Sequence, residues 1–208
     1  MANGALTLEN VKQFAKQRIE ENHRPNRYAF RDRFEHTLRV LNWAERLVSA
    51  EGGDLEVVQY AALLHDIGWD DQIEHALVGR QMAEVFLTSH GYPEAKKAMV
   101  LEAIENHNKR LGDSSQLNLE SRIIMDADIL DEVGAMSIAW DAIAAAAEPD
   151  VTYKSILDRV ETYYAQLASR VPWLQTGTGR KLYEERLAIY TNFIVAYRYE
   201  LGIERSET

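Results

Sequence analysis

Residues 55–67 constrain the fold of this chain more than any other stretch, because they are apolar around nearly the whole of a helix. Residues 60–64 read YAALL, with no charged side chain among them. A helix that is apolar on all sides must be surrounded by other elements to be stable in water. This stretch therefore predicts a helix buried at the centre of a helical bundle.

Apolar residues recur at steps of three and four through most of the remaining chain, which is the period of an amphipathic helix. Polar breaks rich in glycine or proline separate these stretches, at residues 51–54 (EGGD) and 90–93 (HGYP) for example. No strand-like alternation and no internal repeat is present, so the sequence predicts an all-α protein. The expected helices cover residues 8–22, 30–49, 55–67, 74–89, 94–107, a run from 119 towards 147, 153–169 and 180–201.

Length and composition indicate an ordinary globular protein. A chain of 208 residues with 46% hydrophobic residues and no break in composition is expected to form one domain. The absence of cysteine excludes disulfides and thiolate metal ligands. No basic segment precedes a long apolar stretch at the N-terminus, so we expect a cytoplasmic protein without a membrane segment. A net charge of −10 argues against binding of a nucleic-acid polymer, which requires a basic face.

His65 and Asp66, at the end of the central apolar stretch, are the first candidates for chemistry. Neighbouring helix positions point about 100° apart, so the two side chains can share one ion only near a frayed helix end. Gly68 is expected to provide that end as a left-handed cap. An imidazole and a carboxylate suit zinc, manganese or iron. For this pair alone, a histidine that merely favours a helix C-terminus is an equally good interpretation.

Four further residues with metal-ligand side chains lie on helices that must pack together: His36, His75, His107 and Asp128. Each histidine alone has a structural interpretation as a solvated side chain. Asp128 does not, because it lies within residues 126–131 (DADILD), where an apolar run carries three acids. A buried carboxylate needs a cation, a metal ion or several hydrogen-bond donors. One shared metal site accounts for these positions better than separate coincidences do.

The order His36, His65-Asp66, Asp128 resembles the H…HD…D pattern of the HD-domain metal-dependent phosphohydrolases. The flanking residues also fit, and the likeness spans about residues 10–203. It implies an all-α helical bundle of the HD-domain type, with residues 1–208 as a single domain and a C-terminal helical extension from about residue 150. The segments that carry it are residues 36–40 (HTLRV), 65–68 (HDIG), 74–79 (EHALVG), 103–107 (AIENH), 126–131 (DADILD) and 176–180 (TGTGR).

The resemblance also implies a set of metal ligands. His36, His65, Asp66 and Asp128 would bind one divalent ion, which is Mn, Fe, Zn, Ni, Co or Mg. His75 and His107 resemble the extra histidines that hold a second ion bridged by Asp66, or that contact phosphate when only one ion is present. The implied activity is hydrolysis of a small phosphorylated metabolite, a nucleotide in the favoured case, by a metal-activated water.

Other residues are expected to assist this reaction. Asp66, Asp70 and Asp131 are the candidates for catalysis, with Asp70 or its neighbour Asp71 as proton donor. Glu105 and Asp131 are candidates for orienting the histidines. Arg39, Lys109 and Arg110 are candidates for binding the phosphate of the substrate, since guanidinium and ammonium groups complement its oxygens.

Two alternatives remain open. The same set of ligands is similar to that of HD-type di-iron oxygenases. A non-catalytic nucleotide-binding regulatory protein would keep the pocket without the chemistry. The expected partner is a small phosphorylated substrate, and the sequence leaves the oligomeric state open, a homodimer included.

Overall fold

The computed structural model describes residues 5–21, 32–69, 74–110 and 115–203 of the chain. Within these ranges it has nine α-helices, one short 3₁₀ helix and no strand, which confirms the all-α prediction. The helices are α1 (Leu8–Glu21), α2 (Arg33–Glu51), α3 (Leu55–Leu64), α4 (His75–Ser89), α5 (Glu94–Asn106), α6 (Leu119–Asp131), α7 (Ala135–Ala146), α8 (Tyr153–Ala168), η1 (Val171–Trp173) and α9 (Gly177–Glu200). None of the described helices is both long and apolar enough to cross a bilayer.

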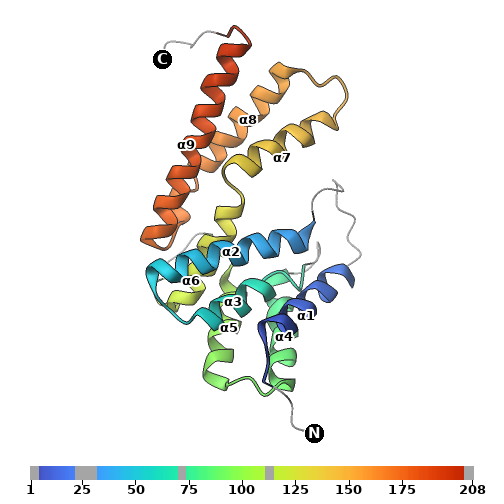
Figure 1. Cartoon of the computed structure of the whole chain (residues 1–208), viewed down its shortest axis with the longest axis vertical. Coiled ribbons are helices and arrows are strands. Elements are labelled where there is room, and N and C mark those ends of the chain that lie inside the picture. Colours follow the sequence, from blue (N-terminus) through green and yellow to red (C-terminus); the bar gives the residue numbers. More distant parts are fainter. Residues whose placement is uncertain (1–4, 22–31, 70–73, 111–114, 204–208) are drawn as a thin grey trace.

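The helices gather in two groups (Figure 1). In the first group, α2 packs on α3 and α6, and α5 packs on α3, α4 and α6. In the second group, α8 packs against both α7 and α9, while α9 also reaches back to α2 and α6. The second group is therefore joined to the first through α2 and through α6, the helix that carries the three acids of residues 126–131.

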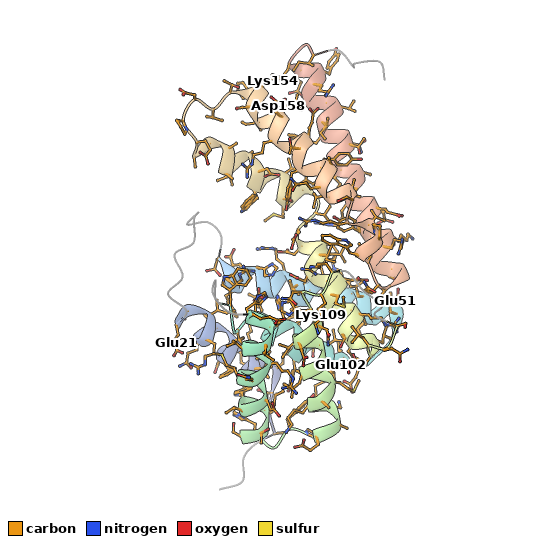
Figure 2. The ribbon with its side chains drawn as sticks, turned by 180° about the vertical axis from the view of Figure 1, so that it is seen from behind. Glu21, Glu51, Glu102, Lys109, Lys154 and Asp158 are labelled. Atoms are coloured by element: carbon orange, nitrogen blue, oxygen red, sulfur yellow. The ribbon has the colours of Figure 1, made fainter. Side chains whose placement is uncertain are left out.

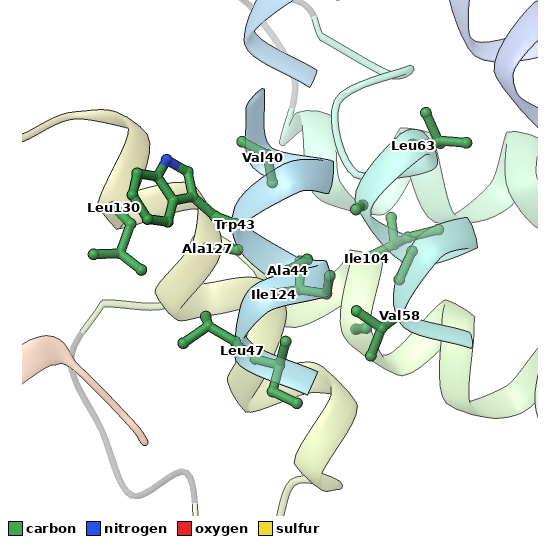
Figure 3. Packing of buried hydrophobic residues seen from close by; sticks show 14 of the residues in the cluster. Val40, Trp43, Ala44, Leu47, Val58, Leu63, Ile104, Ile124, Ala127 and Leu130 are labelled. Atoms are coloured by element: carbon green, nitrogen blue, oxygen red, sulfur yellow. The ribbon is translucent and has the colours of Figure 1, made fainter. Parts of the chain in front are cut away.

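The central position expected for the apolar stretch is confirmed, because α3 packs against α1, α2, α5 and α6. Its residues 60–64 are all buried. Figure 3 shows how side chains from four helices meet in this core: Val40, Trp43, Ala44 and Leu47 of α2, Val58 and Leu63 of α3, Ile104 of α5, and Ile124, Ala127 and Leu130 of α6. This core fixes the helix ends from which the candidate site residues extend.

The starts of the two helices that carry His36 and Asp128 are capped by side chains. Asp32 accepts a hydrogen bond from the backbone nitrogen of Glu35 at 2.9 Å and so caps α2. Asn118 accepts one from the backbone nitrogen of Ser121 at 2.7 Å and caps α6. Each cap satisfies an N–H group that has no partner within its own helix, which sets where the helix begins.

The end of α3 differs from the expectation. The helix stops at Leu64, and Gly68 does not have the left-handed conformation expected of a cap. Gly68 is required there for another reason: a Cβ atom on it would lie 2.2 Å from the backbone nitrogen of Gly79 and 2.6 Å from the carbonyl oxygen of His75. The glycine thus allows the backbone of α4 to approach the turn that carries His65 and Asp66.

The apolar run from residue 119 towards 147 is two helices rather than one. α6 ends at Asp131 and α7 begins at Ala135, with Gly134 between them at a φ of 104°. Glycine adopts this φ without the steric cost that a side chain would bring. The guanidinium of Arg186 also packs where a side chain on Gly134 would lie, with Nη2 only 2.8 Å from the Cβ position. The chain direction therefore changes just after the last acid of α6.

Candidate metal centre

Five elements bring the predicted ligands together. His36 lies on α2, His65 and Asp66 in the turn after α3, His75 at the start of α4, His107 directly after α5, and Asp128 on α6. His65, Asp66, His107 and Asp128 are buried, and the His36 side chain is 13% exposed. The six side chains form two clusters that share Asp66.

The first cluster consists of His36, His65, Asp66 and Asp128. The Nε2 atom of His36 lies 3.6 Å from Oδ2 of Asp66 and 3.3 Å from Oδ1 of Asp128. The Nε2 atom of His65 lies 3.3 Å and 4.0 Å from the same two oxygens. The ligand atoms of His36, His65 and Asp66 lie close enough together to share one ion, and Oδ1 of Asp128 lies next to both imidazole nitrogens.

The second cluster consists of Asp66, His75 and His107. The Nε2 atoms of the two histidines lie 3.2 Å apart, and each is 3.6 Å from Oδ1 of Asp66. The first cluster is arranged around Oδ2 of Asp66 and the second around Oδ1. Asp66 therefore stands where one carboxylate can bridge two ions.

Hydrogen bonds fix which ring nitrogen three of the histidines present to the clusters. Nδ1 of His65 donates to the carbonyl oxygen of Ala62, and Nδ1 of His107 donates to that of Ile104, both at 2.7 Å. Nδ1 of His36 donates to Oδ2 of Asp131, also at 2.7 Å. In a neutral ring the lone pair is then on Nε2, the atom that faces the cluster. Among the described residues, Nε2 of His36 and of His65 is buried without a hydrogen-bond partner, as expected of an atom that binds a cation.

The electrostatics favour positive charge at the first cluster. Burial alone would lower the pKa of His36, but its contacts with Asp128 and Asp131 raise that pKa to about 9. Burial opposes ionisation of Asp66, yet His65, His107 and Arg33 hold the pKa of its carboxyl well below the usual range. Burial and the neighbouring His107 lower the pKa of His75 to about 4. The Asp66 carboxyl is thus ionised and His75 is neutral at pH 7, the states that metal binding requires, whereas His36 is protonated in the metal-free site and must release a proton to bind a cation.

Each of the three carboxylates at the site contacts one arginine. Arg39 donates to both oxygens of Asp131, at 2.7 and 3.0 Å. Arg110 donates to Asp128. Nη1 of Arg33 donates to Oδ2 of Asp66 at 2.8 Å. Arg39 and Arg110 were expected at the phosphate of the substrate, whereas the structure places them on carboxylates of the site. Arg33 was not foreseen, although its position three residues before His36 puts it on the same helix face.

The other predicted residues have different outcomes. Nζ of Lys109 donates to Oδ1 of Asn106 at 2.8 Å, one residue before His107 (Figure 2). Glu105, expected to orient a histidine, pairs instead with Nε of Arg80 at 3.0 Å. Asp70 and Asp71, the two candidates for proton donor, lie outside the described residues.

Asp126, the first of the three acids on α6, joins helices and lies apart from both clusters. Its carboxylate accepts hydrogen bonds from the backbone nitrogen of Gln175 at 2.7 Å and from the backbone nitrogen and hydroxyl of Thr176 at 2.8 and 2.7 Å. Burial raises the pKa of this carboxyl to about 6. A buried carboxylate needs several hydrogen-bond donors, and Asp126 has three among the described residues. Because they come from Gln175 and Thr176, they connect α6 with the start of α9.

The fold and the site define the class: an all-α protein in which histidines and aspartates gather at one candidate metal centre. Comparison with known families points to the same class. Residues 33–132, which span α2 to α6, match the HD domain family. This region therefore is an HD domain, and the resemblance seen in the sequence is confirmed. All six candidate ligands lie inside the matched range.

Known relatives share the fold over nearly the whole chain. The Bacillus subtilis protein YpgQ is 28% identical over 164 residues, which are 76% of this chain and 79% of YpgQ. A predicted HD superfamily hydrolase from an uncultured Thermotogales bacterium is 26% identical with a TM-score of 0.66, covering 94% of this chain and 93% of its own. The structure of YpgQ in complex with ADP has a TM-score of 0.66 at 21% identity, covering 93% and 94%. The fold is thus shared beyond the HD match, through α7 to α9.

Proposed function

We propose that this protein is a metal-dependent hydrolase of small phosphorylated metabolites, with nucleotides as the substrate class. The observation that carries the proposal is the arrangement around Asp66. Imidazole nitrogens from four helix ends or turns converge on its two oxygens, and the buried Nε2 atoms of His36 and His65 have no hydrogen-bond partner in the described part of the chain.

The donor set fits divalent cations. Four imidazoles and two carboxylates, without thiolates, suit manganese, iron, zinc, nickel or cobalt. The first cluster would hold one ion and the second cluster another, with Asp66 between them. Ions bound there supply Lewis acidity towards a water molecule and a phosphoryl oxygen.

The surrounding residues of the chain orient this set. Asp131 accepts the Nδ1 proton of His36 and keeps its Nε2 atom turned towards the cluster, while Arg39 holds Asp131 from the other side. Arg110 fixes Asp128 in the same way. Lys109 follows His107 and supplies positive charge for a substrate phosphate. Asp70 remains our candidate for protonating the leaving group.

The nucleotide class has one supporting observation outside this chain. The relative YpgQ has a structure in complex with ADP, a phosphorylated ligand of the size that we propose. The net charge of −10 favours a small ligand that meets a few local cations over an extended polyanion.

The test is elemental analysis of protein purified without chelator or nickel affinity, followed on the same sample by phosphate release from a panel of nucleotides. We expect two ions per chain, one ion per chain in His75→Gln, and neither ions nor turnover in Asp66→Ala with its helical circular dichroism retained. His90→Gln is the matched control, because His90 ends α4 away from both clusters and contacts the carbonyl oxygen of Phe86.

Two outcomes would contradict this function in favour of the rivals. Tightly bound iron with oxygen consumption and no phosphate release would indicate a di-iron oxygenase. Nucleotide binding without turnover in the metal-loaded protein would indicate a regulatory protein.

A further inference from the structure

Glu132 directly follows α6 and lies between two arginines. Its Oε1 atom is 3.8 Å from Nη2 of Arg110, and its Oε2 atom accepts a hydrogen bond from Nη1 of Arg170. Arg110 belongs to the residues after α5, whereas Arg170 lies in the turn between α8 and η1. The carboxylate of Glu132 therefore connects the two groups of helices at the end of the helix that carries Asp128.

Arg110 links Glu132 to the first cluster. Its guanidinium donates to Oδ2 of Asp128, while Oδ1 of the same carboxylate faces Nε2 of His36 at 3.3 Å. Arg110 thus occupies one oxygen of Asp128 and leaves the other for a cation. Its Nη1 atom also donates to two backbone carbonyl oxygens, at 3.1 and 3.4 Å. A shift of this guanidinium would turn the carboxylate of a candidate ligand.

Arg170 is itself held by aromatic rings of the second group. Its Cζ atom lies 5.4 Å from the centre of the Trp173 ring and 6.0 Å from that of the Tyr163 ring. Cations are attracted to the faces of aromatic rings, so these contacts favour one place for the guanidinium. The Arg170 side chain is only 19% exposed, against 37% for Glu132. Arg170 is therefore a well-fixed anchor for a half-buried carboxylate.

The helix itself does not explain an acid at this position. Glu132 is the C-terminal capping residue of α6. The C-terminal end of a helix carries partial negative charge, which disfavours carboxylates and favours cations. Two arginines from other parts of the chain offset this cost. The role of Glu132 therefore lies in these tertiary contacts.

We propose that Glu132, anchored by Arg170, is a positioning residue for the candidate metal ligand Asp128. It acts through Arg110, because its carboxylate offsets part of the guanidinium charge that competes with a bound cation for Asp128. The affinity of the site for a cation then depends on how the C-terminal helices hold Glu132. This inference rests on the proposed function, because it takes the metal centre as given.

Arg170→Gln distinguishes positioning from a simple effect of charge. Arg170 is a cation, so its removal should by electrostatics alone make a nearby metal ion bind more tightly. Because it anchors Glu132, we expect the opposite, manganese binding about threefold more weakly in calorimetric titrations with manganese alone. Arg170→Lys keeps the charge that pairs with Glu132 and should bind manganese more tightly than Arg170→Gln does.

Glu132→Gln and the double variant test whether the two residues act through one contact. Glu132→Gln keeps the size of the side chain but loses its charge, so manganese should bind about fivefold more weakly. In the protein that carries both Glu132→Gln and Arg170→Gln the loss should stay about fivefold, because Arg170 has no carboxylate to anchor there. If the two losses multiply instead, the residues act independently and the proposal is wrong.

Glu161→Gln is the matched control, since Glu161 of α8 pairs with Nε of Arg198 of α9 at 2.5 Å and its side chain is 26% exposed. This variant removes a similar ion pair within the second group and should leave manganese affinity as in the wild type. Circular dichroism verifies that each variant is folded. Wild-type affinity in Glu132→Gln, or tighter binding in Arg170→Gln, would overturn the proposal. A wild-type protein that binds no manganese would overturn the metal centre itself, which distinguishes the two failures.

Discussion

Asp131 shows how a residue outside the two clusters can set the properties of a ligand. Its carboxylate accepts from Nδ1 of His36 and is held by Arg39. In Asp131→Asn the side chain keeps its size but loses its charge, so the imidazole becomes a weaker and less firmly oriented ligand. We expect manganese affinity to fall about 10–100-fold, measured by calorimetric titration.

The control for this variant is Asp158→Asn. Asp158 lies on α8, where it is exposed and pairs with Lys154 one turn earlier (Figure 2). Removing this charge should leave manganese affinity as in the wild type. An Asp131→Asn protein that binds manganese equally well would contradict the orienting role of Asp131.

The sequence indicated which residues gather at the site, but it did not indicate which partner each acid contacts. The histidines and Asp66 were identifiable because imidazoles and a carboxylate recur on helices that must pack together. Asp126, Asp128 and Asp131 look alike in an apolar run. What separates them is their partners, and the donors to Asp126 lie 49 and 50 residues further along the chain. No local pattern contains that information.

At the scale of elements, the start of α9 is packed against α6 too closely for any side chain larger than glycine at one position. A Cβ atom on Gly179 would lie 2.1 Å from Oδ2 of Asp126 and 2.8 Å from Oγ1 of Thr176. Gly179→Ala must separate these groups and break buried hydrogen bonds. We expect it to lower the free energy of unfolding by about 2–3 kcal/mol in urea denaturation.

Gly177→Ala, in the first turn of the same helix, is the comparison for that variant. The nearest atom to its Cβ position is 3.8 Å away, which is an ordinary contact. Alanine also favours the helix over glycine, so the free energy of unfolding should change by at most about 1 kcal/mol. Equal effects of the two substitutions would mean that contact with Asp126 does not limit the packing of α9.

Helix positions were predictable from the sequence where a local signal marks their ends. The glycines at 52–53 and the polar cluster at 90–93 lie where α2 and α4 end. The turn after α3 was predicted less well. Glycine is needed at position 68 because the backbone of Gly79 on another helix lies so close, and not because the turn requires a left-handed conformation. The break at Gly134 was missed for a similar reason, since the packing of Arg186 of α9 there is a tertiary contact.

For the molecule as a whole, binding of ions should couple to stability, because the candidate ligands come from five separate elements. An ion that binds only the folded state stabilises it by about 2.7 kcal/mol when present at 100 times its dissociation constant. For a chain of this length that raises Tm by about 5–10 °C. We expect this rise in differential scanning fluorimetry when manganese is added to protein stripped with EDTA, and no rise in Asp66→Ala.

The overall architecture followed from the sequence because helix periodicity and one fully apolar helix leave few arrangements other than a bundle. The sequence did not reveal how α7 to α9 sit on the rest. That arrangement depends on contacts such as those of Arg186 with the carbonyl oxygen of Val133 and the ring of Trp43. We propose that residues 1–208 form a single domain.

The hydrogen bonds of Asp126 matter for any attempt to prepare the HD domain as a separate fragment. A fragment trimmed to residues 33–132 would keep all six candidate ligands and yet lack Gln175 and Thr176. A carboxylate would then be left in the interior without donors, two residues before Asp128 on the same helix. The stretch that matches the family is therefore smaller than the stretch that supplies the hydrogen-bond donors of α6, and a fragment meant to keep the candidate ligands in place should include the C-terminal helices.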